Sequence, residues 1–97
     1  MITKNMVKEG YKKGIIKLIP SPNYDGIVCK IGDYWFYFGG RTAEECDDVD
    51  EYKSVVLESD IVNDIYEVLN DFFCYGDCID EYVYYEYYLK EHGIKVD

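Results

Sequence analysis

The residues best suited to covalent or metal chemistry in this 97-residue chain are four cysteines and a single histidine. Cys74 and Cys78 form a C-x3-C pair, whereas zinc knuckles and thioredoxin-like redox sites use C-x2-C. His92 lies on a different turn from this pair, and Cys29 and Cys46 are distant from it in the sequence. Because the N-terminus contains no apolar export segment, disulfides are not expected. The pattern predicts reduced thiols, with no bound metal and no cofactor.

The sequence carries none of the short motifs that mark common catalytic sites. The nucleophile elbow G-x-S-x-G, the P-loop, the H-E-x-x-H zinc motif and the dinucleotide-binding G-x-G-x-x-G are all absent. Acidic residues are abundant, but hydrolysis by paired carboxylates needs a cleft, which a short chain rarely forms. The segment DDVDEY at 47–52 lacks the glycine and the terminal glutamate of an EF-hand loop. We therefore expect a protein that is not an enzyme.

Acidic and basic residues are unevenly distributed along the chain. Residues 1–41 contain seven Lys or Arg and three Asp or Glu, whereas residues 42–97 contain three Lys and seventeen Asp or Glu. With an overall net charge of −10, the chain is expected to repel nucleic acid and to attract basic protein surfaces. The alternative is an acidic surface that serves only solubility.

The tyrosine-rich segment YVYYEYYLKEHG at 82–93 is expected to belong to a helix over about residues 78–91. At 100° per residue, one face gathers the side chains expected to meet the core: Cys78, Ile79, Tyr82, Val83, Tyr85 and Leu89. The other face gathers Asp77, Glu81, Tyr84, Tyr88 and Glu91. Because tyrosines are enriched in binding hot spots and supply contact area at low entropic cost, we predict that this second face binds a partner.

The segment GIVCKIGDYWFYFGG at 26–40 predicts a β-hairpin, because two apolar runs flank the turn residues Gly32 and Asp33. Strand alternation then places six residues on a core face, paired as Ile31 with Tyr34, Cys29 with Phe36, and Ile27 with Phe38. Gly39 and Gly40 are expected to end the sheet.

The opposite hairpin face carries Val28, Lys30, Trp35 and Tyr37. Lys30, Trp35 and Tyr37 form an aromatic platform, which is an alternative binding site for a small molecule or a peptide. Aromatic sheets of this kind also bind RNA. However, the scarcity of lysine and the acidic half of the chain argue against phosphate binding, so direct nucleic-acid binding is not expected.

The remaining elements follow from caps and apolar spacing. Thr3 caps a short helix over 3–12, residues 14–20 form a first strand, and Thr42 with Glu45 reads as a capping box. Ser59 or Asp60 caps a helix whose apolar stripe comprises Ile61, Ile65, Val68, Leu69, Phe72 and Phe73, and which ends before Gly76. These elements predict one α+β domain over residues 1–97: a three-stranded antiparallel sheet with a short N-terminal helix and two C-terminal helices packed on it.

The stretches IVCKIGDYWFYFGG, TAEE, DIVNDIYEVLNDFF and DEYVYYEYYLKEHG resemble a group of small acidic proteins. That group is encoded on conjugative transposons and prophages of Gram-positive gut bacteria, and the resemblance covers most of the chain after residue 14. It implies a setting on a mobile genetic element and no particular activity. In general character the chain is also similar to anti-restriction and anti-CRISPR proteins, which are short, acidic and rich in surface aromatics.

The expected function is therefore non-enzymatic interaction with a basic protein surface, through the acidic, tyrosine-rich helix. Carboxylates on helices can imitate the phosphate spacing of DNA, so inhibition of a host defence nuclease is one form of this function. The alternative is the small-molecule or peptide-binding platform on the hairpin. With no run of 18 apolar residues and no export segment, the expected location is the cytoplasm.

Overall fold

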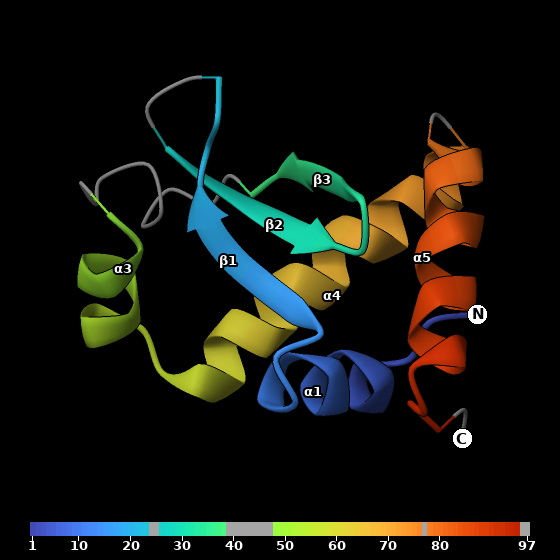
Figure 1. The fold of residues 1–97 in the computed structure, drawn as a ribbon, viewed down its shortest axis with the longest axis horizontal. Helices are drawn as coiled ribbons and strands as arrows, with labels where there is room; N and C mark the ends of the chain where they lie inside the picture. Colours follow the sequence, from blue (N-terminus) through green and yellow to red (C-terminus); the bar gives the residue numbers. More distant parts are fainter. Residues whose placement is uncertain (24–25, 39–47, 77, 96–97) are drawn as a thin grey trace.

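The computed structural model describes residues 1–23, 26–38, 48–76 and 78–95 (Figure 1). Its elements in chain order are α1 (Lys4–Lys12), β1 (Ile16–Pro20), β2 (Ile27–Ile31), β3 (Tyr34–Tyr37), α3 (Val49–Val55), α4 (Glu58–Tyr75) and α5 (Ile79–Glu91). The three strands form one antiparallel sheet in the order β1-β2-β3. Helix α4 crosses one face of this sheet, and α5 stands beside the hairpin turn (Figure 1). The predicted α+β architecture is confirmed.

The hairpin between β2 and β3 turns at Gly32 and Asp33, as predicted. Its register pairs Cys29 with Phe36 and Ile31 with Tyr34. Gly32 has a φ of 68°, in the left-handed region that favours glycine. A Cβ at this position would overlap the Tyr84 hydroxyl and lie 2.9 Å from two ring carbons of Tyr88. The turn therefore requires glycine for its backbone conformation and also for its close approach to α5.

The two hairpin faces are as predicted, with one correction. Ile27, Cys29, Ile31, Phe36 and Phe38 are buried in the core. The side chain of Tyr34, however, is 55% exposed, because it stands at the turn beside the Tyr84 ring instead of over the core. Val28 lies on the opposite hairpin face, as predicted, and is fully buried there. It occupies the central strand and is flanked by Ile19 on β1 and Tyr37 on β3.

The N-terminal helix α1 begins after Thr3, as its sequence predicts. The Thr3 hydroxyl accepts a hydrogen bond from the Met6 amide at 3.2 Å, and the Thr3 amide in turn lies 3.5 Å from the Met6 sulfur. Gly10 lowers the helix propensity of this segment, but a Cβ there would lie 2.8 Å from a methyl group of the buried Ile16. A small residue at this position lets α1 lie close against β1.

Helix α4 begins earlier than predicted. Its N-cap is Leu57, which has no side-chain hydrogen bond, whereas the sequence suggested Ser59 or Asp60. The helix ends at Gly76, whose φ of 73° provides the left-handed C-cap, as expected. The buried residues are Ile61, Val62, Ile65 and Leu69. Val62 was not in the predicted stripe, and Phe73, which was, is 40% exposed because it lies at the far edge of that stripe.

The core lies between the sheet and the helices. Phe36 at its centre packs edge-on against Phe72 of α4, with ring centroids 5.3 Å apart, and lies 5.5 Å from the Tyr85 ring of α5. Tyr52 of α3 is 1% exposed, and its hydroxyl lies 3.4 Å from an Asp64 carboxylate oxygen. Helix α3 begins at an Asp48 cap, whose side chain accepts a hydrogen bond from the Glu51 amide.

Some sequence predictions fall outside the described residues. They are the end of the sheet at Gly39 and Gly40, the capping box of Thr42 and Glu45, the thiol of Cys46, and the cap or contact role of Asp77.

We predict that Gly32→Ala costs more stability than Gly14→Ala. Both glycines have positive φ, so each substitution carries the left-handed backbone cost, but only the Cβ at position 32 meets other atoms. The expected losses are roughly 2–4 kcal/mol for Gly32→Ala and about 1 kcal/mol for Gly14→Ala. Chemical denaturation of both variants measures the difference. Equal losses would show that the turn does not press against α5.

Candidate functional site

Tyr84 and Tyr88, which the sequence placed on the partner-binding face, lie against the hairpin turn. The Tyr84 hydroxyl accepts a hydrogen bond from the Asp33 amide at 3.0 Å. Its ring meets Tyr34 edge-on at 4.8 Å and stacks on Tyr88 at 5.9 Å between centroids. Both Tyr84 and Tyr88 are half-buried.

This placement corrects the predicted geometry of the tyrosine-rich helix. The prediction that Tyr84 and Tyr88 share one solvent-exposed face with Glu81 and Glu91 is wrong, because both rings are half-buried at the hairpin turn, where Tyr84 contacts Tyr34 of β3 and Tyr88 lies close to Gly32. Glu81 and Glu91 are exposed, and Asp77 lies outside the described residues. The structure therefore gives both tyrosines a packing role. A contact role for these residues stays a prediction.

The core-facing side of α5 is narrower than the helical wheel predicted. Tyr82, Tyr85 and Leu89 are buried, and Cys78 is half-buried. Ile79 and Val83, predicted to be buried, are 39% and 56% exposed. Tyr82, Tyr85 and Leu89 form the buried face of the helix, and Ile79 and Val83 lie outside it. The predicted core-facing side therefore included too much of the helix circumference.

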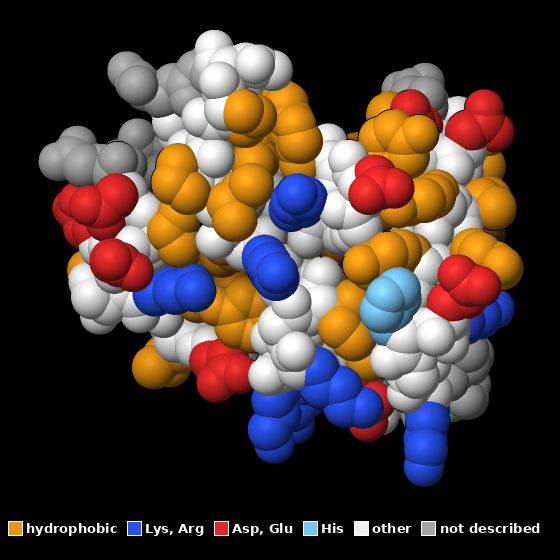
Figure 2. All heavy atoms as spheres, viewed as in Figure 1, with side chains coloured by type: hydrophobic (Ala, Val, Ile, Leu, Met, Phe, Trp, Pro, Cys, Tyr) orange, Lys and Arg blue, Asp and Glu red, His pale blue; other side chains and the backbone are white. Residues whose placement is uncertain are grey.

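Ile79, Val83 and Tyr87 instead form a row on the solvent side of α5. They are spaced four residues apart, which places them one above the other on the same helix face. Tyr87 is 59% exposed. Two exposed acids, Asp80 and Glu91, flank this row. We call these five residues the outer α5 face, and Figure 2 shows hydrophobic and acidic side chains interleaved along this side of the molecule.

Two side chains toward the C-terminal end of α5, Tyr87 and Glu86, form polar contacts that shift their pKa values. The Tyr87 hydroxyl donates a hydrogen bond to Glu91 at 2.7 Å, which raises the pKa of Tyr87. Glu86 binds the N-terminal amine of Met1 and, at 3.0 Å, the Lys90 ammonium. These bonds lower the pKa of Glu86. The charge of Glu86 is thus balanced by two cations of the protein itself. Glu91 is exposed to solvent, and its carboxylate accepts a hydrogen bond from the neutral Tyr87 hydroxyl.

Sequence reasoning missed the outer α5 face because it assigned Ile79 and Val83 to the core. The signal was present in the four-residue spacing of residues 79, 83 and 87. This spacing could not be distinguished from that of the neighbouring core residues, because a helix with apolar residues on nearly all sides has no single apolar face. Two apolar residues near the end of α4 are also exposed: Phe73 is 40% exposed and Tyr75 74% exposed.

Lys30, Trp35 and Tyr37, the residues of the predicted aromatic platform, lie on the same face of the hairpin. Lys30 lies opposite Trp35 on β3 and opposite Lys17 on β1. Lys30 is exposed, Trp35 is half-buried, and Tyr37 is 50% exposed. A hollow of about 240 Å³ lies next to it, lined in part by Lys17, Lys30 and Tyr88. Its volume is below the range of about 300–1,000 Å³ typical of sites that enclose a small molecule.

The described cysteines differ in exposure. Cys29 is buried, which raises the pKa of its thiol and keeps it protonated. Cys74 is exposed, Cys78 is half-buried, and all three are free thiols. Within the described part of the chain, no three His, Cys, Asp or Glu side chains converge as a metal site would require. The His92 ring stacks on Tyr88 at 4.0 Å between centroids.

Comparison of the chain with protein-family models, curated proteins and solved structures found no match. Among the described residues, no helix combines the length and the apolar character needed to cross a bilayer. Inference about function therefore depends on the surfaces themselves.

We predict that Tyr84→Phe destabilises the protein and Tyr87→Phe does not. The first change removes the acceptor of the Asp33 amide, and the second removes a hydrogen bond made in full contact with water. The expected loss is about 1 kcal/mol for Tyr84→Phe and close to zero for Tyr87→Phe. Urea denaturation measures both. If the two variants lose the same stability, the hydroxyl of Tyr84 has no structural role.

Proposed function

We propose that the protein is a non-enzymatic interaction protein whose outer α5 face binds a basic segment of a partner protein. The row of Ile79, Val83 and Tyr87 carries this proposal. These side chains are 39%, 56% and 59% exposed, although the same helix buries Tyr82, Tyr85 and Leu89 almost completely on its other side. Contiguous exposed apolar side chains rimmed by polar groups are characteristic of protein-binding surfaces.

The charge around this row favours a basic partner. Residues 58–91 contain ten acidic residues and a single lysine. That lysine, Lys90, is paired with Glu86. Asp80 and Glu91 are exposed beside the row. Charges at the rim of an interface increase the association rate, while desolvation of the apolar centre supplies most of the affinity. A partner segment with apolar and basic residues on one face would satisfy both requirements.

Helix α4 also carries exposed acids, namely Asp60, Glu67 and Asp71. Rows of carboxylates on two helices support a finer form of the proposal, in which the protein occupies the nucleic-acid channel of a basic protein such as a host defence nuclease. Because salt screens charges but does not weaken apolar contacts, the row of Ile79, Val83 and Tyr87 should keep part of the binding at high salt. A purely electrostatic mimic of nucleic acid would lose it.

The aromatic platform of Lys30, Trp35 and Tyr37 is the second candidate. The row of Lys17, Lys30 and Trp35 across the sheet favours a ligand with an anionic group and a flat apolar part. It is ranked lower because the hollow beside it is small.

We predict that Val83→Ser with Tyr87→Ser abolishes partner binding while leaving the fold intact. The test immobilises the wild-type chain and this double variant, exposes both to extract of the native host, and identifies proteins that only the wild type retains. Each retained protein is then purified, and its affinity is measured at two salt concentrations. The proposal expects a basic protein whose affinity falls about tenfold between roughly 0.05 and 0.5 M salt and does not vanish.

Two charge variants provide the matched control. Asp80→Asn with Glu91→Gln removes two charges at the outer α5 face, and Asp60→Asn with Glu67→Gln removes two exposed charges on α4. The first pair should weaken binding more than the second. Retention that is unaffected by the change at Val83 and Tyr87, or binding that does not depend on salt, would contradict the proposal.

A further inference from the structure

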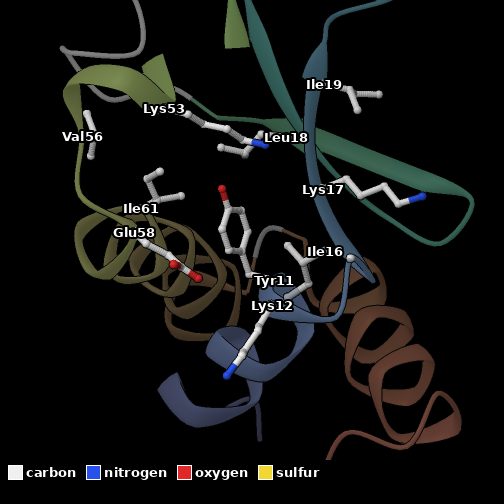
Figure 3. Close-up of a pocket in the computed structure, with 11 residues that line it drawn as sticks. Tyr11, Lys12, Ile16, Lys17, Leu18, Ile19, Lys53, Val56, Glu58 and Ile61 are labelled. Carbon is white, nitrogen blue, oxygen red and sulfur yellow. The ribbon is translucent and has the colours of Figure 1, made fainter. Parts of the chain in front are cut away.

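A groove of about 570 Å³ lies between α1, β1 and the segment that joins α3 to α4, remote in sequence from α5 (Figure 3). Its volume falls within the range of known small-molecule sites. Leu18, Val56 and Ile61 contribute apolar surface to it, and Leu18 and Ile61 are almost completely buried. The groove therefore has an apolar floor that is part of the protein core.

Two hydrogen-bond donors face this floor. The ring of Tyr11 stands in the groove with its hydroxyl pointing inward, and Lys53 extends across the groove from α3 (Figure 3). The Lys53 ammonium lies 5.8 Å from the centroid of the Tyr11 ring. Among the described residues, neither the Tyr11 hydroxyl nor the Lys53 ammonium has a hydrogen-bond or ion-pair partner.

The Tyr11 hydroxyl keeps its proton at neutral pH. Burial raises the pKa of Tyr11, and the negative charge of Glu58 raises it further. The hydroxyl can thus donate a hydrogen bond, and Lys53 can donate a charge-assisted one. Tyr11 belongs to α1 and Lys53 to α3. The fold brings the two donors together, and no pattern of neighbouring residues in the sequence indicates that they meet.

We propose that this groove binds an amphipathic small molecule with a single negative charge, of the class of medium-chain carboxylates. Lys53 and Tyr11 bind the carboxylate, and the apolar body of the ligand covers Leu18 and Ile61. This site is separate from the outer α5 face and does not depend on the function proposed for it.

The electrostatics of the groove select for one negative charge. Glu58 lines the same groove, and its carboxylate opposes part of the positive charge of Lys53, so the groove has no positive charge left to balance a second negative charge on the ligand. Lys12 and Lys17 also line it, but their ammonium groups point away from its centre (Figure 3). They add positive potential at the rim without a second binding point. A polyphosphate or a nucleic acid would need several ammonium groups directed inward, and among the described residues that line the groove only Lys53 meets this condition.

The direct test is an NMR titration of the full chain with octanoate, octanamide and octanedioate. These probes share a chain length and differ in charge: one negative charge, none and two. Octanoate should give saturable shifts confined to resonances of residues around Tyr11, Leu18 and Ile61. Octanamide should bind about tenfold more weakly, because it lacks the charge-assisted bond to Lys53. Octanedioate should bind more weakly than octanoate, because its second carboxylate meets Glu58 or must remain in water.

Variants separate a site from general attraction to lysine. Lys53→Gln is expected to weaken octanoate binding about tenfold, and Tyr11→Phe to weaken it severalfold. Lys13→Gln is the matched control, since Lys13 is an exposed neighbour that loses the same charge and does not line the groove. It should change the affinity less than about twofold, since it removes only a screened surface charge. Melting curves of all three variants verify that each is folded.

Three results would overturn the proposal. They are shifts spread over the surface instead of the groove, equal affinity for octanoate and octanamide, or equal effects of Lys53→Gln and Lys13→Gln.

Discussion

The contact between the hairpin turn and α5 determines which side of the last helix remains available to other molecules. Gly32 has no side chain where the hydroxyl of Tyr84 and the ring of Tyr88 approach the backbone, and the next amide donates a hydrogen bond to Tyr84. Tyr82, Tyr85 and Leu89 are buried beside this contact. With these two sides of α5 engaged, Ile79, Val83 and Tyr87 lie on a further side that faces water.

This arrangement explains why a short helix contains so many tyrosines. Each has a distinct environment: Tyr82 accepts a hydrogen bond from the Ile2 amide at 2.5 Å, Tyr85 packs on Phe36, and Tyr84 holds the hairpin turn. A tyrosine can bury its ring and still satisfy a polar group at the edge of the core. Tyr87 alone is fully directed to solvent, where it binds Glu91. Most tyrosines of α5 thus pack within the protein, and Tyr87 contributes to the proposed interface.

The sequence correctly predicts those structural features that depend on residues close together in the chain. The Thr3 cap, the hairpin register and the end of α4 at Gly76 each depend on residues within a few positions of one another, and each is confirmed. The contact of Asp33 with Tyr84 joins residues 51 positions apart. No periodicity within α5 could show that a distant turn covers Tyr84 and Tyr88, so they were read as exposed. The Tyr11 and Lys53 groove was missed for the same reason, because its two donors come from separate elements.

Basic and acidic side chains are unevenly distributed over the described surface. In the view of Figure 2, most lysine side chains lie over the middle and the bottom, where a few acidic side chains also appear, and most acidic side chains lie toward the left and right. The proposed interface and the proposed groove therefore differ in sign and select different ligands. The small anion proposed to bind near Tyr11 and the basic segment proposed to bind at α5 would therefore not compete directly for charge.

Hydrogen exchange of the Asp33 amide tests the central contact most directly. This amide belongs to an exposed turn residue, so its protection depends on the bond to Tyr84. We predict slow exchange in the wild type and about tenfold faster exchange in Tyr84→Phe, with no change at the Glu51 amide, which Asp48 binds independently. An Asp33 amide that already exchanges at the rate of an unprotected residue in the wild type would contradict the contact and, with it, the assignment of the outer α5 face.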